Sequence, residues 1–206
     1  MTASIAFYFD LVSPYGYLGI GPIERVAAAH GRSVDWCPVL IGITILKIMG
    51  MKPLPQTPIK GPYLHTDAIR LARLQGVPFR HHDLQGVSSL AAMRAFVWIK
   101  GQDPALAVRF AKRVYERLWV RGQDITSAQA VAEEAAALGL DPDATLAAVA
   151  SPEIKEALAA AVEVAIHKGV FGVPFVIADG ESFWGGDRAP MLDHWLQHHT
   201  WEPPPE

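Results

Sequence analysis

The sequence predicts an α/β protein in which the two ends of the chain build one small mixed sheet and a long helical block lies between them. Three observations predict this class. Residues 4–40 read as strand, helix, strand. Residues 63–168 carry apolar side chains at helical spacing, and residues 174–198 read as strand, strand, helix. A chain of 206 residues fits one domain with an insertion, or two small domains.

The first half begins with an aromatic-rich strand over residues 4–11. A helix follows to about residue 30, because Ser13 is a good N-cap and Pro14 can occupy the first helical position. Residues 33–40 form the second strand. A strand, a helix and a further strand in this order form a right-handed crossover.

The middle of the chain is predicted to be mostly helical. Residues 41–49 form a short apolar helix, whereas residues 51–62 form an irregular loop because four prolines exclude regular structure there. The helices expected after this loop share apolar stripes, and they span residues 63–75, 88–100, 104–120, 127–138, 142–150 and 151–168.

The C-terminal segment contains a hairpin signal. Short strands over 174–178 and 182–184 flank Asp179-Gly180, a pair that favours a tight turn. A final helix spans residues 188–198. A crossover followed, after inserted helices, by a hairpin and a helix is the thioredoxin arrangement.

We therefore divide the chain into a thioredoxin-like domain, residues 1–60 and 169–206, and a helical insertion domain, residues 61–168.

Composition excludes several classes of function. The net charge is −3 and no basic block is present, so neither nucleic acid nor an anionic membrane is an expected partner. No apolar run reaches about 18 residues, and no basic segment precedes the first apolar run, so neither a membrane span nor a signal peptide is expected. Cys37 is the only cysteine, so no internal disulfide forms and a reducing compartment, the cytoplasm, is expected.

The turn between the first strand and the first helix carries the main chemical signal. A thiol-disulfide oxidoreductase has Cys-x-x-Cys here, but this chain has Ser13 and Gly16 at those two positions. A helix N-terminus stabilises a thiolate, and a serine hydroxyl can donate to it, so the turn predicts a site that steers the thiol of another molecule. The other interpretation is that Ser13 only caps the helix.

Val173-Pro174 is the second candidate, at the start of the third strand. A cis bond would turn the Val173 backbone N–H and C=O outward beside the Ser13 turn, where they could pair with a peptide-like ligand. A trans proline at the start of a strand is the alternative.

Three further places in the sequence carry candidate ligand-binding residues. Gly186 and Asp187 are placed to hold an ammonium group, unless Asp187 is only the N-cap of the last helix. Lys60 is placed to hold a carboxylate, unless it is simply solvated. Lys47 lies on the short apolar helix, where it either holds a substrate anion or extends its charge to water.

No metal site is predicted. The adjacent pairs His81-His82 and His198-His199 do not share a helical face, and no third ligand has suitable spacing. Cys37 lies among strand residues and is expected to be a buried structural thiol.

Several fragments, taken in order, resemble one known family over nearly the whole chain. They are Phe7-Tyr8-Phe9-Asp10 with Ser13-Pro14-Tyr15, Lys60-Gly61-Pro62-Tyr63 with Asp67, Ser89-Leu90-Ala91-Ala92-Met93-Arg94, Asp124-Ile125-Thr126, Phe171-Gly172-Val173-Pro174 and Gly185-Gly186-Asp187-Arg188. The family is the DsbA-like branch of the thioredoxin superfamily that holds 2-hydroxychromene-2-carboxylate isomerases and kappa-class glutathione transferases.

The resemblance implies glutathione as cofactor. Ser13 would hold its sulfur, Lys60 its glycine carboxylate and Val173 its cysteinyl backbone. The remaining cofactor contacts that it implies are Pro174, Trp184, Gly185, Gly186 and Asp187. Tyr15 and Lys47 are the implied substrate contacts. Trp184-Gly185 resembles the isomerases more than the transferases, and Met51 stands where the transferases tend to have asparagine.

The implied activity is isomerisation of 2-hydroxychromene-2-carboxylate, or a similar aromatic-degradation intermediate, by reversible thiolate addition, ring opening and cis-trans isomerisation. A kappa-like transferase that conjugates an electrophile is the alternative, and a binding module without chemistry is a third reading. The resemblance also implies a homodimer.

Overall fold

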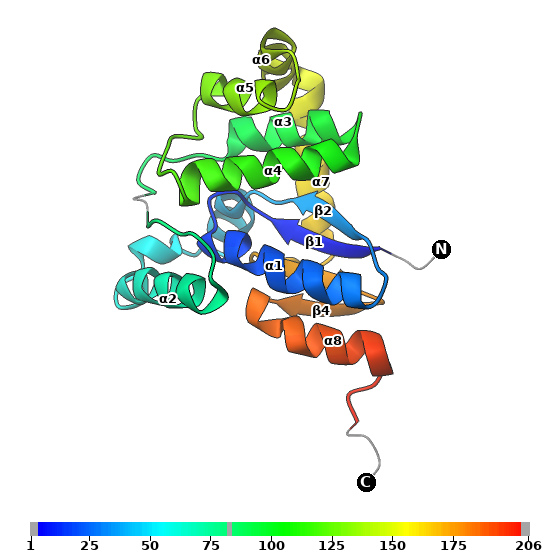
Figure 1. The fold of residues 1–206 in the computed structure, drawn as a ribbon. Coiled ribbons are helices and arrows are strands. Elements are labelled where there is room, and N and C mark those ends of the chain that lie inside the picture. The colour runs from blue at the N-terminus through cyan, green and yellow to red at the C-terminus, as the bar shows by residue number, and fades with distance from the viewer. Residues whose placement is uncertain (1–3, 82–83, 203–206) are drawn as a thin grey trace.

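The structure is a computed structural model that describes residues 4–81 and 84–202. The two ends of the chain build one four-stranded sheet with the order β2-β1-β3-β4, which confirms the predicted class (Figure 1). β1 (Ile5–Phe9) runs parallel to β2 (Val34–Pro38) and antiparallel to β3 (Phe175–Ala178). β3 continues antiparallel into β4 (Glu181–Trp184).

The alternation of side chains along β1 places two apolar clusters on opposite faces of the sheet. Phe7 and Phe9 belong to the large core, which also contains buried residues of α1 (Pro14–Ala29). Tyr8 belongs to a smaller cluster that includes Ala165 of α7 (Pro152–His167). In Figure 1, α1 and α8 (Ala189–His198) lie on one side of the sheet, and α7 runs behind it.

The predicted helical block is confirmed. Its other members are α2 (Lys60–Gln75), α3 (Leu90–Lys100), α4 (Pro104–Trp119), α5 (Ala128–Ala136) and α6 (Pro142–Ala150). Each expected helix is present, with ends that differ by at most three residues. None of the helices in the described residues is long and apolar enough to cross a membrane.

The helical block is attached directly to the end of β1. Phe9 packs edge-on against Phe96 of α3, with ring centroids 4.9 Å apart. The Tyr115 hydroxyl of α4 donates to the Asp10 carbonyl at 3.0 Å, and the Trp119 indole donates to the Leu11 carbonyl at 3.0 Å. These contacts hold the backbone that leads into Ser13. The two-domain division remains a prediction, but both parts share one core.

The prediction of an irregular loop over residues 51–62 is wrong in the middle and at the end of this range. Leu54–Gln56 forms a 3-10 helix, and α2 begins at Lys60, so Pro62 lies in the first turn of that helix. Proline is tolerated there because the first N–H groups of a helix have no partner four residues earlier. The short helix predicted over 41–49 is present as a π-helix, Gly42–Ile48.

The hairpin prediction is confirmed. Asp179 and Gly180 have φ values of 49° and 87°, and such positive values at both central residues are typical of the type I′ turn. The Arg32 guanidinium donates to both Asp179 oxygens, at 2.9 and 2.7 Å. This pair ties the β3–β4 turn to the segment between α1 and β2.

Candidate functional site

Ser13 caps α1, as the sequence predicts. Its Oγ accepts the Gly16 N–H at 3.0 Å, and its own N–H donates to the Asp10 carbonyl at 2.9 Å. The residue is only 5 % exposed. The cap and the buried turn place the hydroxyl at the positive end of the α1 dipole.

The peptide bond between Val173 and Pro174 is cis, so the trans interpretation is wrong. The proline lies directly against α1. A Cβ added to Gly19 would lie 2.8 Å from the Pro174 Cγ, and one added to Gly186 would lie 2.8 Å from the Gly19 Cα. The start of β3 and the segment after β4 therefore both approach α1 closely, and at Gly19 and Gly186 this approach leaves no room for a side chain.

The segment from Trp184, the last residue of β4, to Asp187 borders this meeting point. The Gly185 N–H donates to the Pro174 carbonyl at 2.9 Å, and Gly185 has a φ of 99°. Trp184 is exposed, and its ring packs edge-on against Phe171, with centroids 5.0 Å apart. The Trp184 ring also lies against Gly172, the residue before Val173, so the two rings form an aromatic wall at this segment.

Asp187 lies in the short 3-10 helix Gly186–Arg188, labelled η3, and is exposed. It is not the N-cap of α8, which is Arg188, so the capping interpretation is wrong. Its carboxylate pairs with Arg188 at 2.8 Å. An exposed ion pair of this kind contributes little to stability. Because the Asp187 carboxylate is also exposed, it is accessible to a ligand cation.

Lys60 is exposed at the first position of α2 rather than on a loop. Tyr63 and Asp67 follow three and seven residues later, so the three side chains share one face of α2. Ile59, directly before Lys60, has a φ of 70°, which is rare for a β-branched residue. The Lys60 N–H donates to the Pro58 carbonyl at 2.8 Å across this tight turn.

Asp67 connects α2 to the turn that carries Ser13. The Tyr15 hydroxyl donates to one Asp67 oxygen at 2.6 Å, and the Tyr63 hydroxyl donates to the other at 3.2 Å. Burial, followed by the hydrogen bond to Asp67, raises the pKa of Tyr15 well above its usual range. Tyr15 is therefore neutral at physiological pH. Sequence reasoning assigned no role to Asp67, although its spacing from Lys60 and Tyr63 is a usable signal.

Two predicted residues lie apart from this group. Lys47 is exposed on η1 (Gly42–Ile48), and within residues 4–81 and 84–202 no recorded contact links it to another predicted site residue. Cys37 is partly rather than fully buried, which corrects the expected burial. Desolvation, followed by the charge of Asp35, raises the pKa of the Cys37 thiol to about 12, so it stays protonated at neutral pH.

Asp10 is a buried carboxylate next to the site. Its oxygens accept the Ile41 N–H at 2.8 Å and the Val12 N–H at 3.3 Å. Desolvation raises the pKa of Asp10, whereas these hydrogen bonds and one from Ser89 oppose the rise. The side chain thereby joins the end of β1 to the starts of η1 and α3. In the described part of the chain, no group of three or more His, Cys, Asp or Glu side chains is suited to hold a metal ion.

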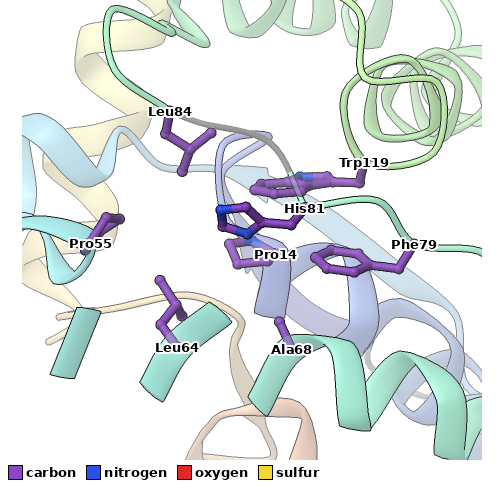
Figure 2. Close-up of a pocket in the computed structure, with 8 residues that line it drawn as sticks. All are labelled: Pro14, Pro55, Leu64, Ala68, Phe79, His81, Leu84 and Trp119. Carbon is purple, nitrogen blue, oxygen red and sulfur yellow. The ribbon is translucent and has the colours of Figure 1, made fainter. Parts of the chain in front are cut away.

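A cavity of about 60 Å³ lies beside Pro14, the residue after Ser13 (Figure 2). Its lining is mostly apolar and comes from the start of α1, from α2, from the end of α4 and from Pro55, Phe79, His81 and Leu84. The predicted insertion thus contributes part of a pocket wall next to the Ser13 turn.

Comparisons with known proteins identify the family of this chain. The family model described as a DSBA-like thioredoxin domain matches residues 4–197. The chain is 30% identical to a 2-hydroxychromene-2-carboxylate isomerase of Sphingobium xenophagum over 95% of this chain and 99% of that protein. It is 29% identical to human glutathione S-transferase kappa 1 over 94% and 90% of the two chains.

Solved structures extend the comparison to three dimensions. A 2-hydroxychromene-2-carboxylate isomerase structure superposes with a TM-score of 0.85 at 25% identity and covers 96% of each chain. A cytosolic disulfide reductase from Pseudomonas aeruginosa, solved with GSH, has a TM-score of 0.65 at 17% identity, which shows a shared fold alone.

Proposed function

The chain belongs to the DsbA-like thioredoxin family, and from this premise we propose that it is a glutathione-dependent isomerase. Its substrate would be 2-hydroxychromene-2-carboxylate or a related conjugated intermediate of aromatic degradation. Two full-length relatives, an isomerase and a kappa transferase, support an enzyme of this general kind.

The observation that carries the proposal is the convergence of Gly19, Pro174 and Gly186 beside the capped N-terminus of α1. The two glycines let these segments pack in direct contact, and we propose that the surface beside them is a shallow cradle for a ligand. The Val173 backbone at its edge is suited to pair with a peptide-like molecule.

The charged groups around the cradle are complementary to glutathione, which carries a thiol, one ammonium group and two carboxylates. The Asp187 carboxylate suits the ammonium group, and the Lys60 ammonium suits a carboxylate. The Ser13 hydroxyl and the α1 dipole suit the sulfur. The residues present therefore fit this cofactor.

Bound glutathione would supply a thiol that adds reversibly to a conjugated carbon of the substrate. The protein's own contribution is to hold that sulfur in its ionised form. The α1 N-terminus favours negative charge, and the Ser13 Oγ already accepts from Gly16, so its proton is available for donation. The hydrogen bond from Tyr15 to Asp67 keeps both groups fixed beside the turn.

Glutathione binding measured by calorimetry tests the proposal. We expect the dissociation constant to rise roughly tenfold in Asp187→Asn and in Lys60→Gln, since each removes one charge-assisted contact. Glu163→Gln is the matched control, because Glu163 is an exposed carboxylate whose only recorded partner among the described residues is His167, at 3.7 Å. Absence of binding in the wild type at millimolar glutathione would contradict the proposal.

The alternative is a kappa-like transferase, favoured by the similarity to the human enzyme. The two activities differ in whether glutathione is consumed. A substrate turned over while free thiol stays constant supports the isomerase, and stoichiometric loss of thiol supports the transferase.

We also propose a cytoplasmic location and a homodimer. The single cysteine fits a reducing compartment. Sedimentation equilibrium of the full chain tests the dimer directly, since a mass near 22.4 kDa would identify a monomer.

A further inference from the structure

The cavity beside Pro14 has a mostly apolar wall that includes one imidazole, that of the exposed residue His81. Among its eight lining residues in the described part of the chain, His81 is the titratable one, and Leu64, Phe79, Leu84 and Trp119 supply apolar surface. Figure 2 shows the His81 ring directed into the middle of this lining, with Pro14 and Trp119 close to it.

Hydrogen bonds hold the backbone on either side of Phe79, and they thereby fix the position of the segment that leads into His81. The Tyr17 hydroxyl of α1 donates to the Pro78 carbonyl at 3.0 Å. The Arg80 N–H donates to the Trp119 carbonyl at 2.6 Å. Phe79 stacks on Trp119 with centroids 5.5 Å apart. His81 directly follows this fixed segment.

A second histidine supports the ring from the side of α2. His65 meets His81 edge-on, with ring centroids 3.8 Å apart and planes 84° apart. This contact limits rotation of the His81 ring.

The cavity is small, so it admits a few atoms of a ligand rather than a whole bicyclic ring. An oxygen atom that enters an apolar site loses its hydrogen bonds to water unless a donor replaces them. His81 is placed to be that donor.

We propose that His81 donates a hydrogen bond from its imidazole to a carbonyl or carboxylate oxygen of a conjugated aromatic acceptor. This inference rests on the proposed function and names a specificity determinant for its substrate. The cavity begins one residue after Ser13, so an acceptor held there keeps its conjugated carbon near the N-terminus of α1. The site thereby selects conjugated acids and ketones over hydrocarbons of the same shape.

Ligand-detected NMR with two probes of similar shape tests this inference without glutathione. Cinnamate carries the conjugated carboxylate, and trans-β-methylstyrene lacks it. We expect His81→Ala to weaken cinnamate binding about tenfold or more and to leave methylstyrene binding unchanged. His81→Gln keeps an N–H donor and should restore part of the affinity.

Two further variants locate the effect. His194→Ala, on α8 away from the cavity lining, should leave both probes unaffected. Ala68→Leu adds bulk to the buried lining and should weaken both probes. The inference is overturned if His81→Ala leaves cinnamate binding intact, if it weakens both probes equally, or if Ala68→Leu affects neither.

Calorimetry with glutathione on the same variants separates this inference from the proposed function. Normal glutathione binding with no role for His81 in cinnamate binding would reject the inference alone. Cinnamate binding that depends on His81, in a protein that binds no glutathione, would reject the proposed cofactor alone.

Discussion

Ser13 has a capping role in the fold that is compatible with its proposed role in chemistry. The cap uses a lone pair of its Oγ, which accepts the Gly16 N–H, and the hydroxyl proton is not needed for that contact. The two interpretations of Ser13 in the sequence are therefore compatible. In the proposed site, the capping hydrogen bond would hold the Ser13 hydroxyl in a fixed position relative to the ligand sulfur.

We expect Ser13→Ala to lower the free energy of unfolding by about 1 kcal/mol, as loss of an N-cap usually does. It should also raise the pKa of the bound glutathione thiol, measured from the ultraviolet absorbance of the thiolate as pH is varied. Ser127→Ala is the matched control, because the Ser127 Oγ caps α5 by accepting the Ala130 N–H at 3.2 Å. A thiol pKa that is unchanged in Ser13→Ala would leave this residue with a capping role alone.

The pair of Asp179 with Arg32 should make the stability of the fold depend on pH. Its hydrogen bonds from Arg32 lower the pKa of the carboxyl below its ordinary value of 3.8. Because the folded pKa is the lower one, the pair stabilises the fold above about pH 4 and loses this contribution as pH falls through the folded pKa. Asp179→Asn tolerates the same positive φ and removes the charge.

The free energies of unfolding of the wild type and Asp179→Asn, measured with urea across this pH range, should therefore converge at acidic pH. A difference that stays constant or grows as the pH falls would show that the ionised carboxylate contributes nothing.

At the scale of elements, α1 is the piece that joins the sheet, η3 and the cis proline. Its residue Gly19 lies against both Pro174 and Gly186. The distance between α1 and these segments is therefore set by the absence of a side chain, and the shape of the proposed cradle depends on it.

Gly19→Ala should destabilise the protein by about 1–3 kcal/mol, because the new methyl group must push α1 away from Pro174. Gly101→Ala, at the C-terminal end of α3, is the control. Its φ of −65° suits alanine, and its Cβ would make only ordinary contacts with the Trp98 and Val97 carbonyl oxygens, at 3.5 and 3.7 Å, so we expect little change. Urea denaturation of both variants measures the contrast, and equal effects would contradict the close-approach argument.

At the scale of the whole molecule, the sheet and the inserted helices share one hydrophobic core. Phe9 of β1, Phe96 of α3 and Tyr115 of α4 belong to the same buried cluster. The hydrogen bonds from Tyr115 and Trp119 to the end of β1 strengthen this connection. Within residues 4–81 and 84–202, the largest buried cluster is therefore common to both parts.

We therefore expect the chain to unfold in a single cooperative transition. Tryptophan fluorescence and far-ultraviolet circular dichroism should report the same midpoint in urea. Two separated transitions would show that the insertion and the thioredoxin-like part unfold independently.

The sequence by itself determined the order of elements, the Ser13 cap and the Asp179-Gly180 turn, because each depends on residues close together in the chain. It also predicted roles for Pro174 and Gly186, but it gave no sign that Gly19 lies against both of them. It misplaced the start of α2, because a rule that prolines exclude regular structure does not apply to the first turn of a helix.

Only the tertiary structure decided which fragments meet. The approach of Gly19 to Pro174 and Gly186, the hydrogen bond from Tyr15 to Asp67 and the contact between His65 and His81 each join separate segments of the chain. Local patterns carry no information about such distances, which are set by the packing of the sheet and the helical block around one core.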